Sequence, residues 1–364
     1  MGPQDTPNPT EHSTDEQSRK LSIDILTGQH RDIFTRAVEN VLSTEIAQIT
    51  YAQIADGLPL SSVEKDTYAF GALTYDHPLH TNHIDLCPAA LEKTRQLYAD
   101  FNPHTLCMDR KLIHAYQAAS PGSRAFQTRL IELTAVAIHQ IAVQLFKLDI
   151  GLHKDDGIAS WTPPRENTMF WRRNPNGPPP TLFRHRLYRD YDQYPEGVAD
   201  GVGYWAETRI LGGVALFDRR KPESDPPVGL EHLPSIDPDA IYFHSDRKRV
   251  TYRIYRLLDS QKQQLLDFLL SEETPPASCP LPILGDDDNR QRVDPEEPIV
   301  DTGIYRDEWE RKPPPRDKPD GRVRDVKDAL NYPTMDDWKA SRSRGFDKKE
   351  EMYRHHEEDS DLEE

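Results

Sequence analysis

The hydrophobic pattern of this chain is strongest between residues 124 and 152. Leucine, isoleucine and valine recur there every three or four residues, which is the spacing of one face of an α-helix. The stripe is so broad that only a narrow polar arc remains for water. About 25 residues at roughly 1.5 Å each give a rod on the order of 37 Å. The pattern therefore predicts a central core helix on which shorter elements pack.

The rest of the N-terminal half shows the same periodicity. Three more stretches have helical spacing and end at glycine or proline signals, and they cover residues 31–55, 89–101 and 111–119. The first of them is one long helix or two short ones. Ser61 and Glu64 have the spacing of a capping box, which predicts another short helix. An all-helical N-terminal half is expected, packed around the central rod.

The pattern changes beyond residue 157. Residues 161–194 show neither the helical spacing nor the alternation of a strand, but they are rich in aromatic side chains. We therefore expect an ordered, irregular loop that covers the helices. A helix is expected next, entered from the glycine-rich turn at Gly197. Short β-branched and aromatic runs at a period of two then predict strands, and a closing helix follows at 260–271. The strands are predicted at 210–217, 240–244 and 250–257.

Both ends of the chain differ from this core. Residues 1–20 and 274–364 are dominated by polar, charged and proline residues, which cannot bury enough apolar area to offset the entropy of ordering. The sequence therefore predicts a disordered leader, one globular domain at 21–273, and a mostly disordered acidic tail at 274–364. The predicted fold class is α+β, mainly helical, with a long central helix and a small antiparallel sheet.

Charge and cysteine content restrict the classes of partner and compartment. The chain has 364 residues with a formal net charge of −17, which disfavours binding to nucleic acids and to anionic membranes. Charged side chains interrupt the central helix, so it is not predicted to span a membrane. Three widely spaced cysteines cannot form a disulfide scaffold and fit a reducing compartment. We therefore expect a soluble protein of the cytoplasm or the nucleus.

The first chemical candidate lies in the loop at residues 75–88. His77, His80 and His83 are spaced by three residues, and Asp85 and Cys87 follow directly. Imidazole, carboxylate and thiolate groups are all ligands of transition metals, so this spacing suggests a metal site. The alternative is that Pro78 holds these residues in a loop, where the histidines bind a partner or make local hydrogen bonds.

A second candidate follows the central helix. His153 and Asp155 form an H-x-D triplet like that of non-haem iron oxygenases, and His244 could supply the distal histidine, as could two other histidines at 185 and 232. However, such a triplet normally leaves a strand of a barrel, and too few strands are predicted here to form one. The alternative is that His153 and Asp155 only satisfy the end of the helix.

Two stretches resemble a family of uncharacterised filamentous-fungal proteins. One is the run at residues 192–207 (DQYPEGVADGVGYWAE) with the following ILGGVALFDR at 210–219, and the other is LTAVAIHQIAVQLF at 133–146. The resemblance covers residues 85 to 271 and leaves out the tail. It implies a fungal, intracellular origin and no particular activity, so it assigns no site residue.

The sequence supports two functional hypotheses. The first is a non-enzymatic protein-interaction module that binds a protein partner through its charged tail, where aromatic residues are spaced among charged ones. The second is a metal-dependent enzyme, similar to a non-haem iron oxygenase, that acts on a small molecule. No catalytic residue is assigned. The pair Gly201 and Gly203 does not extend to a dinucleotide-binding motif, so no organic cofactor is predicted.

Overall fold

The computed structural model describes residues 20–67, 73–221, 235–273, 276–295 and 299–311, with isolated residues between 334 and 354. Its centre is helix α8 (Arg124–Lys147), which Ser123 caps by accepting a hydrogen bond from the amide of Phe126. The predicted central helix is confirmed, but it ends five residues early. Asp149 has a positive φ of 52°, which turns the chain away from the helix axis.

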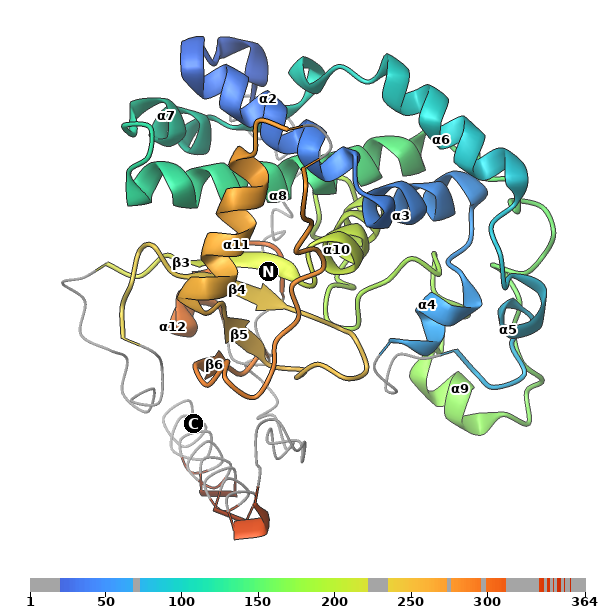
Figure 1. Cartoon of the computed structure of the whole chain (residues 1–364). Coiled ribbons are helices and arrows are strands. Elements are labelled where there is room, and N and C mark those ends of the chain that lie inside the picture. The colour runs from blue at the N-terminus through green and yellow to red at the C-terminus, as the bar shows by residue number, and fades with distance from the viewer. Residues whose placement is uncertain are drawn as a thin grey trace, which may run out of the picture.

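Helices from both sides of the sequence surround α8 (Figure 1). α2 (Gly28–Leu42) and α3 (Glu45–Asp56) form the predicted pair at 31–55, and Thr44 separates them by capping α3. α10 (Val198–Ile210) lies along α8, and α6 (Pro88–Asp100) lies along α3. α7 (Arg110–Ala118) also packs on α8. Together these contacts bury most of the surface of α8.

Short elements connect these helices. α4 (Ser61–Lys65) and α5 (Leu79–Asn82) lie between α3 and α6. Two 3₁₀ turns, η1 (Ile23–Ile25) and η2 (Pro103–Thr105), flank a small sheet of β1 (Lys20–Ser22) and β2 (Cys107–Asp109). The aromatic stretch at 161–194 is largely irregular apart from α9 (Thr168–Arg173), and Phe183 and Tyr188 within it are buried.

The main sheet has five antiparallel strands in the order β6-β5-β4-β3-β7. Three of them correspond to predicted strands: β4 (Ile241–His244) and β5 (Ile254–Arg256) lie within the predicted bounds, whereas β3 (Val214–Asp218) is shifted, since Ile210 still belongs to α10. The closing helix α11 (Asp259–Leu270) packs on α2, where the Asn40 amide donates to the Phe268 carbonyl at 3.1 Å. An α+β fold that is mainly helical is confirmed.

The predicted domain end at residue 273 is wrong. β6 (Arg292–Val293) pairs with β5, and β7 (Ile304–Tyr305) pairs with β3 after the short helix α12 (Ile299–Thr302). Val293 and Ile304 are fully buried. The domain therefore continues to residue 311, because two edge strands from the predicted tail complete the sheet. The predicted leader at 1–20 lies outside the described residues except for Lys20, which begins β1, and most of the predicted tail beyond 311 also lies outside them.

Helix α8 is the one described helix that is long and apolar enough to cross a membrane by length and composition. In its most apolar window, 72% of the residues are buried inside the fold. Leu130, Leu133 and Ile138 are among them, each at most 1% exposed. The apolar surface of α8 is therefore accounted for by packing against the other helices.

Candidate metal centre

The ends of two core helices meet at the centre of the candidate site. α3 ends at Gly57, whose φ of +98° is favourable for glycine. Gly151, beyond α8, packs so closely on Gly57 that an added Cβ would lie 3.0 Å from the Gly57 Cα. The His153 amide donates to the Asp56 carbonyl at 3.0 Å. This contact fixes His153 beside the last residue of α3.

The loop before α6 approaches the same point. Its His83 carbonyl accepts a hydrogen bond of 2.9 Å from the Ser61 amide. The Cys87 amide donates to Asp56 Oδ2 at 2.9 Å, and Pro88 then begins α6. The Asp56 carboxylate therefore fixes the backbone of this loop, and it also faces the side chains of His83 and Cys87.

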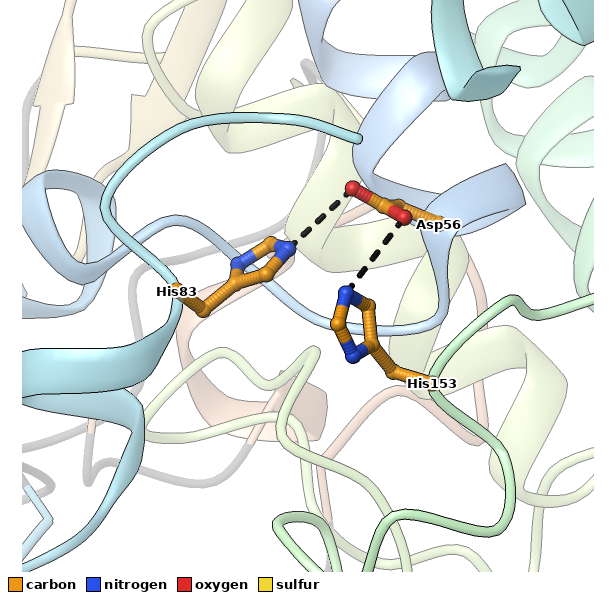
Figure 2. A group of neighbouring side chains, drawn as sticks. All are labelled: Asp56, His83 and His153. Carbon is orange, nitrogen blue, oxygen red and sulfur yellow. Dashed lines mark hydrogen bonds and ion pairs between the residues drawn. The ribbon is translucent and has the colours of Figure 1, made fainter. Parts of the chain in front are cut away.

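Three potential metal ligands converge here, Asp56, His83 and His153, and the Cys87 sulfur stands beside the last of them. His83 Nε2 lies 3.1 Å from Asp56 Oδ2, and His153 Nε2 lies 3.7 Å from Asp56 Oδ1 (Figure 2). Cys87 Sγ is 3.2 Å from His153 Nε2. Among the described residues, Asp56, His83 and His153 form the one group whose ligand atoms lie within 4.8 Å of one another. Tetrahedral zinc with bonds of about 2.0 to 2.3 Å places its ligand atoms about 3.3 to 3.6 Å apart, close to these separations.

The second nitrogen of each imidazole is held by an acceptor. His83 Nδ1 lies 3.0 Å from the Pro59 carbonyl, and His153 Nδ1 lies 2.6 Å from Asp156 Oδ2. A carbonyl or carboxylate oxygen can only accept, so both Nδ1 atoms carry hydrogen. In the chain alone, His83 Nε2 donates to Asp56 Oδ2 at 3.1 Å; with a metal bound, each Nε2 would instead supply a lone pair on the side that faces Asp56. Contacts of this kind orient metal-binding histidines.

The electrostatics of the site call for positive charge. Burial alone would raise the pKa of Asp56, but hydrogen bonds from His83 and the Cys87 amide outweigh it and lower the pKa, so the carboxylate stays ionised. Burial alone would lower the pKa of His83, but the contacts with Asp56 and Pro59 raise it. Asp56 is fully buried, and its Oδ1 has no hydrogen-bond partner within the described part of the chain. A cation between these side chains would satisfy that oxygen.

The contacts of Cys87 also resemble a catalytic triad of thiol, histidine and carboxylate. Its Sγ faces His153, whose ring is held by Asp156, and Cys87 stands at the start of α6. However, burial and the neighbouring Asp56 raise the pKa of the thiol, which opposes formation of a nucleophilic thiolate. The Cys87 amide already donates to Asp56 and cannot stabilise an oxyanion. The arrangement therefore suits a metal ion better than covalent catalysis.

The structure does not bring His77, His80 and His83 together as one ligand set. His77 Nδ1 accepts from the Leu79 amide, and the ring packs edge-on against Trp161 at 5.0 Å. Burial lowers the pKa of His77 to about 4 and also lowers the pKa of His80. The reason is local, because the turn of α5 directs His77 toward a different neighbour from His83. Of the three histidines, His83 alone joins the centre.

The set His153, Asp155 and His244 is separated as well. Asp155 is exposed, and the neighbouring Asp156 contacts His153 instead. His244 is buried in β4, where Nδ1 meets the Tyr188 hydroxyl at 3.1 Å and Nε2 meets the Tyr252 carbonyl at 3.2 Å. Burial, with a further contribution from the neighbouring His185, holds the pKa of His244 well below its ordinary value. His244 is therefore a neutral core histidine whose two nitrogens are already occupied.

Sequence reasoning missed Asp56 altogether and treated Cys87 only as a neighbour of the histidines. One signal for Asp56 was present, because an acidic residue in the last turn of a helix opposes the helix dipole. A carboxylate placed there at that cost needs a compensating partner. The compensating groups are 27 and more residues away in sequence, at His83, Cys87 and His153.

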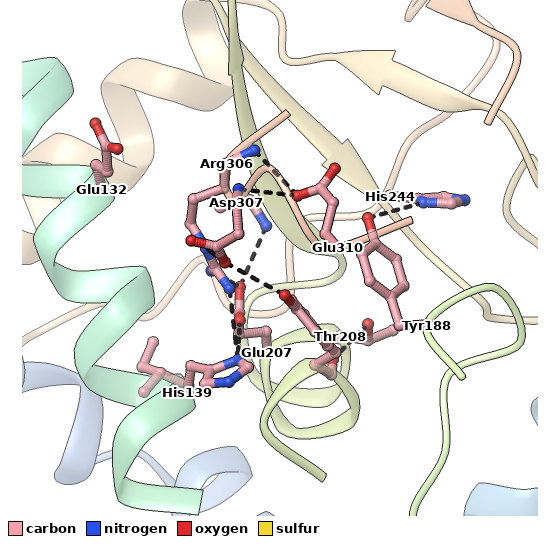
Figure 3. A network of polar contacts seen from close by, with 12 residues as sticks. Glu132, His139, Tyr188, Glu207, Thr208, His244, Arg306, Asp307 and Glu310 are labelled. Carbon is pink, nitrogen blue, oxygen red and sulfur yellow. Dashed lines mark hydrogen bonds and ion pairs between the residues drawn. The ribbon is translucent and has the colours of Figure 1, made fainter. Parts of the chain in front are cut away.

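A second buried polar cluster lies between α8, α10 and the residues after β7 (Figure 3). His139 Nδ1 is 2.8 Å from Glu207 and His139 Nε2 is 3.0 Å from Asp200, while Arg306 binds Glu207 at 2.7 Å and Asp307 at 2.9 Å. Both partners of His139 are carboxylates, so the ring is an imidazolium. His139 is therefore a satisfied core histidine, and the cluster serves the fold.

Comparison with protein-family models, curated proteins and solved structures found no match to this chain. The resemblance to filamentous-fungal proteins therefore stays a prediction. Functional inference for this chain depends on the geometry of its own side chains.

Proposed function

We propose that this protein binds one transition metal ion, of the chemical class of zinc, through Asp56, His83, Cys87 and His153. The observation that supports this most is the direction of the two imidazole rings. Each ring donates from Nδ1 to an oxygen acceptor and turns Nε2 toward the same buried carboxylate. Two nitrogens, one carboxylate and one sulfur are ligands that zinc prefers.

A bound ion would complete the contacts of Asp56. In the chain alone, His83 donates from Nε2 to Asp56 Oδ2 at 3.1 Å, whereas Oδ1 is buried and has no hydrogen-bond partner among the described residues. His153 Nε2 lies 3.7 Å from that oxygen, too far for a hydrogen bond. A divalent ion between these side chains would bind the carboxylate and both imidazoles.

The proposed role of the ion is structural. The four ligands come from the end of α3, the loop before α6, the start of α6 and the segment after α8. Four protein ligands complete a tetrahedron and leave no position for water or substrate. Such a centre stabilises irregular chain segments that have few apolar side chains to bury. This supports the hypothesis of a non-enzymatic protein.

A second candidate is a non-haem iron enzyme. Asp56, His83 and His153 are two histidines and one carboxylate, which is the ligand set of iron-dependent oxygenases. Such enzymes need open coordination positions beside a substrate cavity. Here the Cys87 sulfur stands 3.2 Å from His153 Nε2, and Asp56 and His83 are at most 1% exposed. These contacts favour the closed zinc-type centre.

Elemental analysis tests both candidates. The full-length protein, purified without chelators, is expected to carry about one equivalent of zinc per chain. His83→Ala and Cys87→Ala should lose most of it. His114→Ala and Cys107→Ala are matched controls, because both residues are exposed and lie outside the centre, and they should keep the metal. Circular dichroism checks that each variant folds. Stoichiometric iron in place of zinc would favour the enzyme, and a metal-free, folded wild type would refute both proposals.

The predicted interaction role is kept as a proposal for the chain beyond residue 311. Its motivation is the charged sequence with spaced aromatic residues, and a reducing cytoplasm or nucleus suits the free Cys87 thiol. Because β6 and β7 belong to the domain and its described residues run to 311, a deletion must begin at 312. Capture of partners by the full chain and by residues 1–311 should differ, and identical partners would count against a binding role for this segment.

A further inference from the structure

The three cysteines of this chain have different surroundings. The sulfurs of Cys107 and Cys279 are near main-chain carbonyls only, at 3.9 and 4.0 Å. The Cys87 sulfur instead lies 3.2 Å from His153 Nε2 and belongs to a residue that binds Asp56 through its amide. Among the described thiols, Cys87 is thus the one within contact distance of an imidazole nitrogen.

The position of the Cys87 sulfur ties it to what occupies the centre. It lies 3.2 Å from His153 Nε2, on a residue whose amide is fixed by Asp56. The buried Oδ1 of Asp56, which has no hydrogen-bond partner among the described residues, is the independent sign that a cation belongs here. A thiolate is the form of cysteine that binds a metal ion and also the form that peroxide oxidises, so a cation in the centre would hold Cys87 in its oxidisable form.

Solvent can reach the centre from one side. Asp56 and His83 are enclosed, whereas the His153 side chain is 20% exposed and Cys87 is half-buried. The outer partner of His153, Asp156, is 32% exposed. This exposed side is the one from which a molecule as small as hydrogen peroxide would approach the sulfur.

We propose that Cys87 is a modification site, at which oxidation by hydrogen peroxide removes a ligand and releases the metal ion. This inference rests on the proposed metal centre. The thiolate sulfur attacks one peroxide oxygen, the O–O bond breaks, and the other oxygen leaves as hydroxide, which takes a proton from solvent to become water. Sulfur loses two electrons and peroxide gains them. The resulting sulfenic acid is a poor metal ligand, so only Asp56, His83 and His153 continue to hold the ion.

The test uses the full-length chain with Cys107→Ser and Cys279→Ser, which leaves one thiol. The zinc-loaded protein is treated with hydrogen peroxide. Zinc release is followed with a chromogenic chelator, and sulfenic acid is followed by dimedone labelling and mass spectrometry. The expected result is loss of about one equivalent of zinc at the same rate as labelling of Cys87, and rebinding after reduction by a thiol.

A matched variant separates oxidation of sulfur from damage elsewhere. Cys87→Asp in the same background supplies a carboxylate ligand that peroxide does not oxidise, and its zinc release should be at least about tenfold slower. Zinc that stays bound while Cys87 is labelled would overturn the inference, as would equal release from both proteins. Zinc that resists peroxide with Cys87 unlabelled would also overturn it and leave the metal centre intact. Absence of zinc from the purified wild type would instead remove the metal centre itself.

Discussion

Replacement of Arg306 by alanine is expected to destabilise the domain strongly. The Arg306 side chain is 3% exposed and binds Glu207 at 2.7 Å and Asp307 at 2.9 Å. Glu207 is fully buried, so the variant leaves an enclosed carboxylate with His139 as its remaining close cation. Removal of one partner from a buried ion pair costs about 3 to 5 kcal/mol. This is a large part of the roughly 5 to 15 kcal/mol by which domains are stable.

Urea unfolding followed by circular dichroism measures this loss. Wild type and variant are compared in the presence of a chelator, because bound metal would add its own stabilisation to the folded state. Lys147→Ala is the control, since it removes an ion pair with Glu196 at 2.8 Å whose side chains are 57% and 36% exposed. Its cost should be at most about 1 kcal/mol. A loss for Arg306→Ala as small as that of the control would refute the assignment of Arg306 as a buried anchor.

Two further predictions concern the same region. The first concerns pH. Burial alone would lower the pKa of His139, but the hydrogen bonds to Asp200 and Glu207 raise it. The stabilisation that the charged His139 gives the folded state is therefore complete below about pH 6.5 and is lost as the pH rises through the folded-state pKa. Denaturant midpoints of wild type and His139→Gln measured from pH 6 upward should therefore converge as pH rises, and a constant difference would contradict the imidazolium. The second concerns chain length: residues 1–273 should fail to fold cooperatively because β6 and β7 are missing, whereas residues 1–311 should unfold like the full chain. Equal stability of both truncations would contradict the role of the two edge strands.

Elements with a buried face were predictable from the sequence. α8 and α10 bury most of their surface, and their apolar positions show the helical period directly. The three strands β3, β4 and β5 were predictable as short runs of β-branched and aromatic residues, because nearly all of their side chains are buried. The end of α8 was misplaced because Asp149, which has a positive φ, is not a residue that reliably signals a helix end.

The two edge strands from the C-terminal segment, β6 and β7, were not predictable from the sequence. β6 and β7 have two residues each, too few to establish a period. The segment is held by charge as much as by apolar packing, since Arg311 donates to the carbonyls of Pro295 and Ile304 and Arg306 is buried in ion pairs. The charged, proline-rich composition of this segment therefore led to a prediction of disorder, although Arg306 and Arg311 are buried in the domain.

The candidate site was predictable from the sequence only in part. Histidines at 83 and 153 were noticed, but His83 was grouped with His77 and His80 and His153 with Asp155 and His244, and neither with the other. Their convergence depends on Gly57 and Gly151, which allow the ends of α3 and the segment after α8 to meet. Such a contact between distant segments leaves no periodic trace, so it could be found only from the three-dimensional arrangement.

X-ray absorption at the zinc edge of the full-length protein tests the metal centre most directly. The account predicts a four-coordinate ion with two imidazole nitrogens and one carboxylate oxygen at about 2.0 to 2.2 Å and one sulfur at about 2.3 Å. Replacement of Cys87 by serine should remove the sulfur contribution and leave the imidazoles. A wild-type spectrum with a shell of oxygen or water ligands, or with no sulfur, would contradict coordination by Asp56, His83, Cys87 and His153.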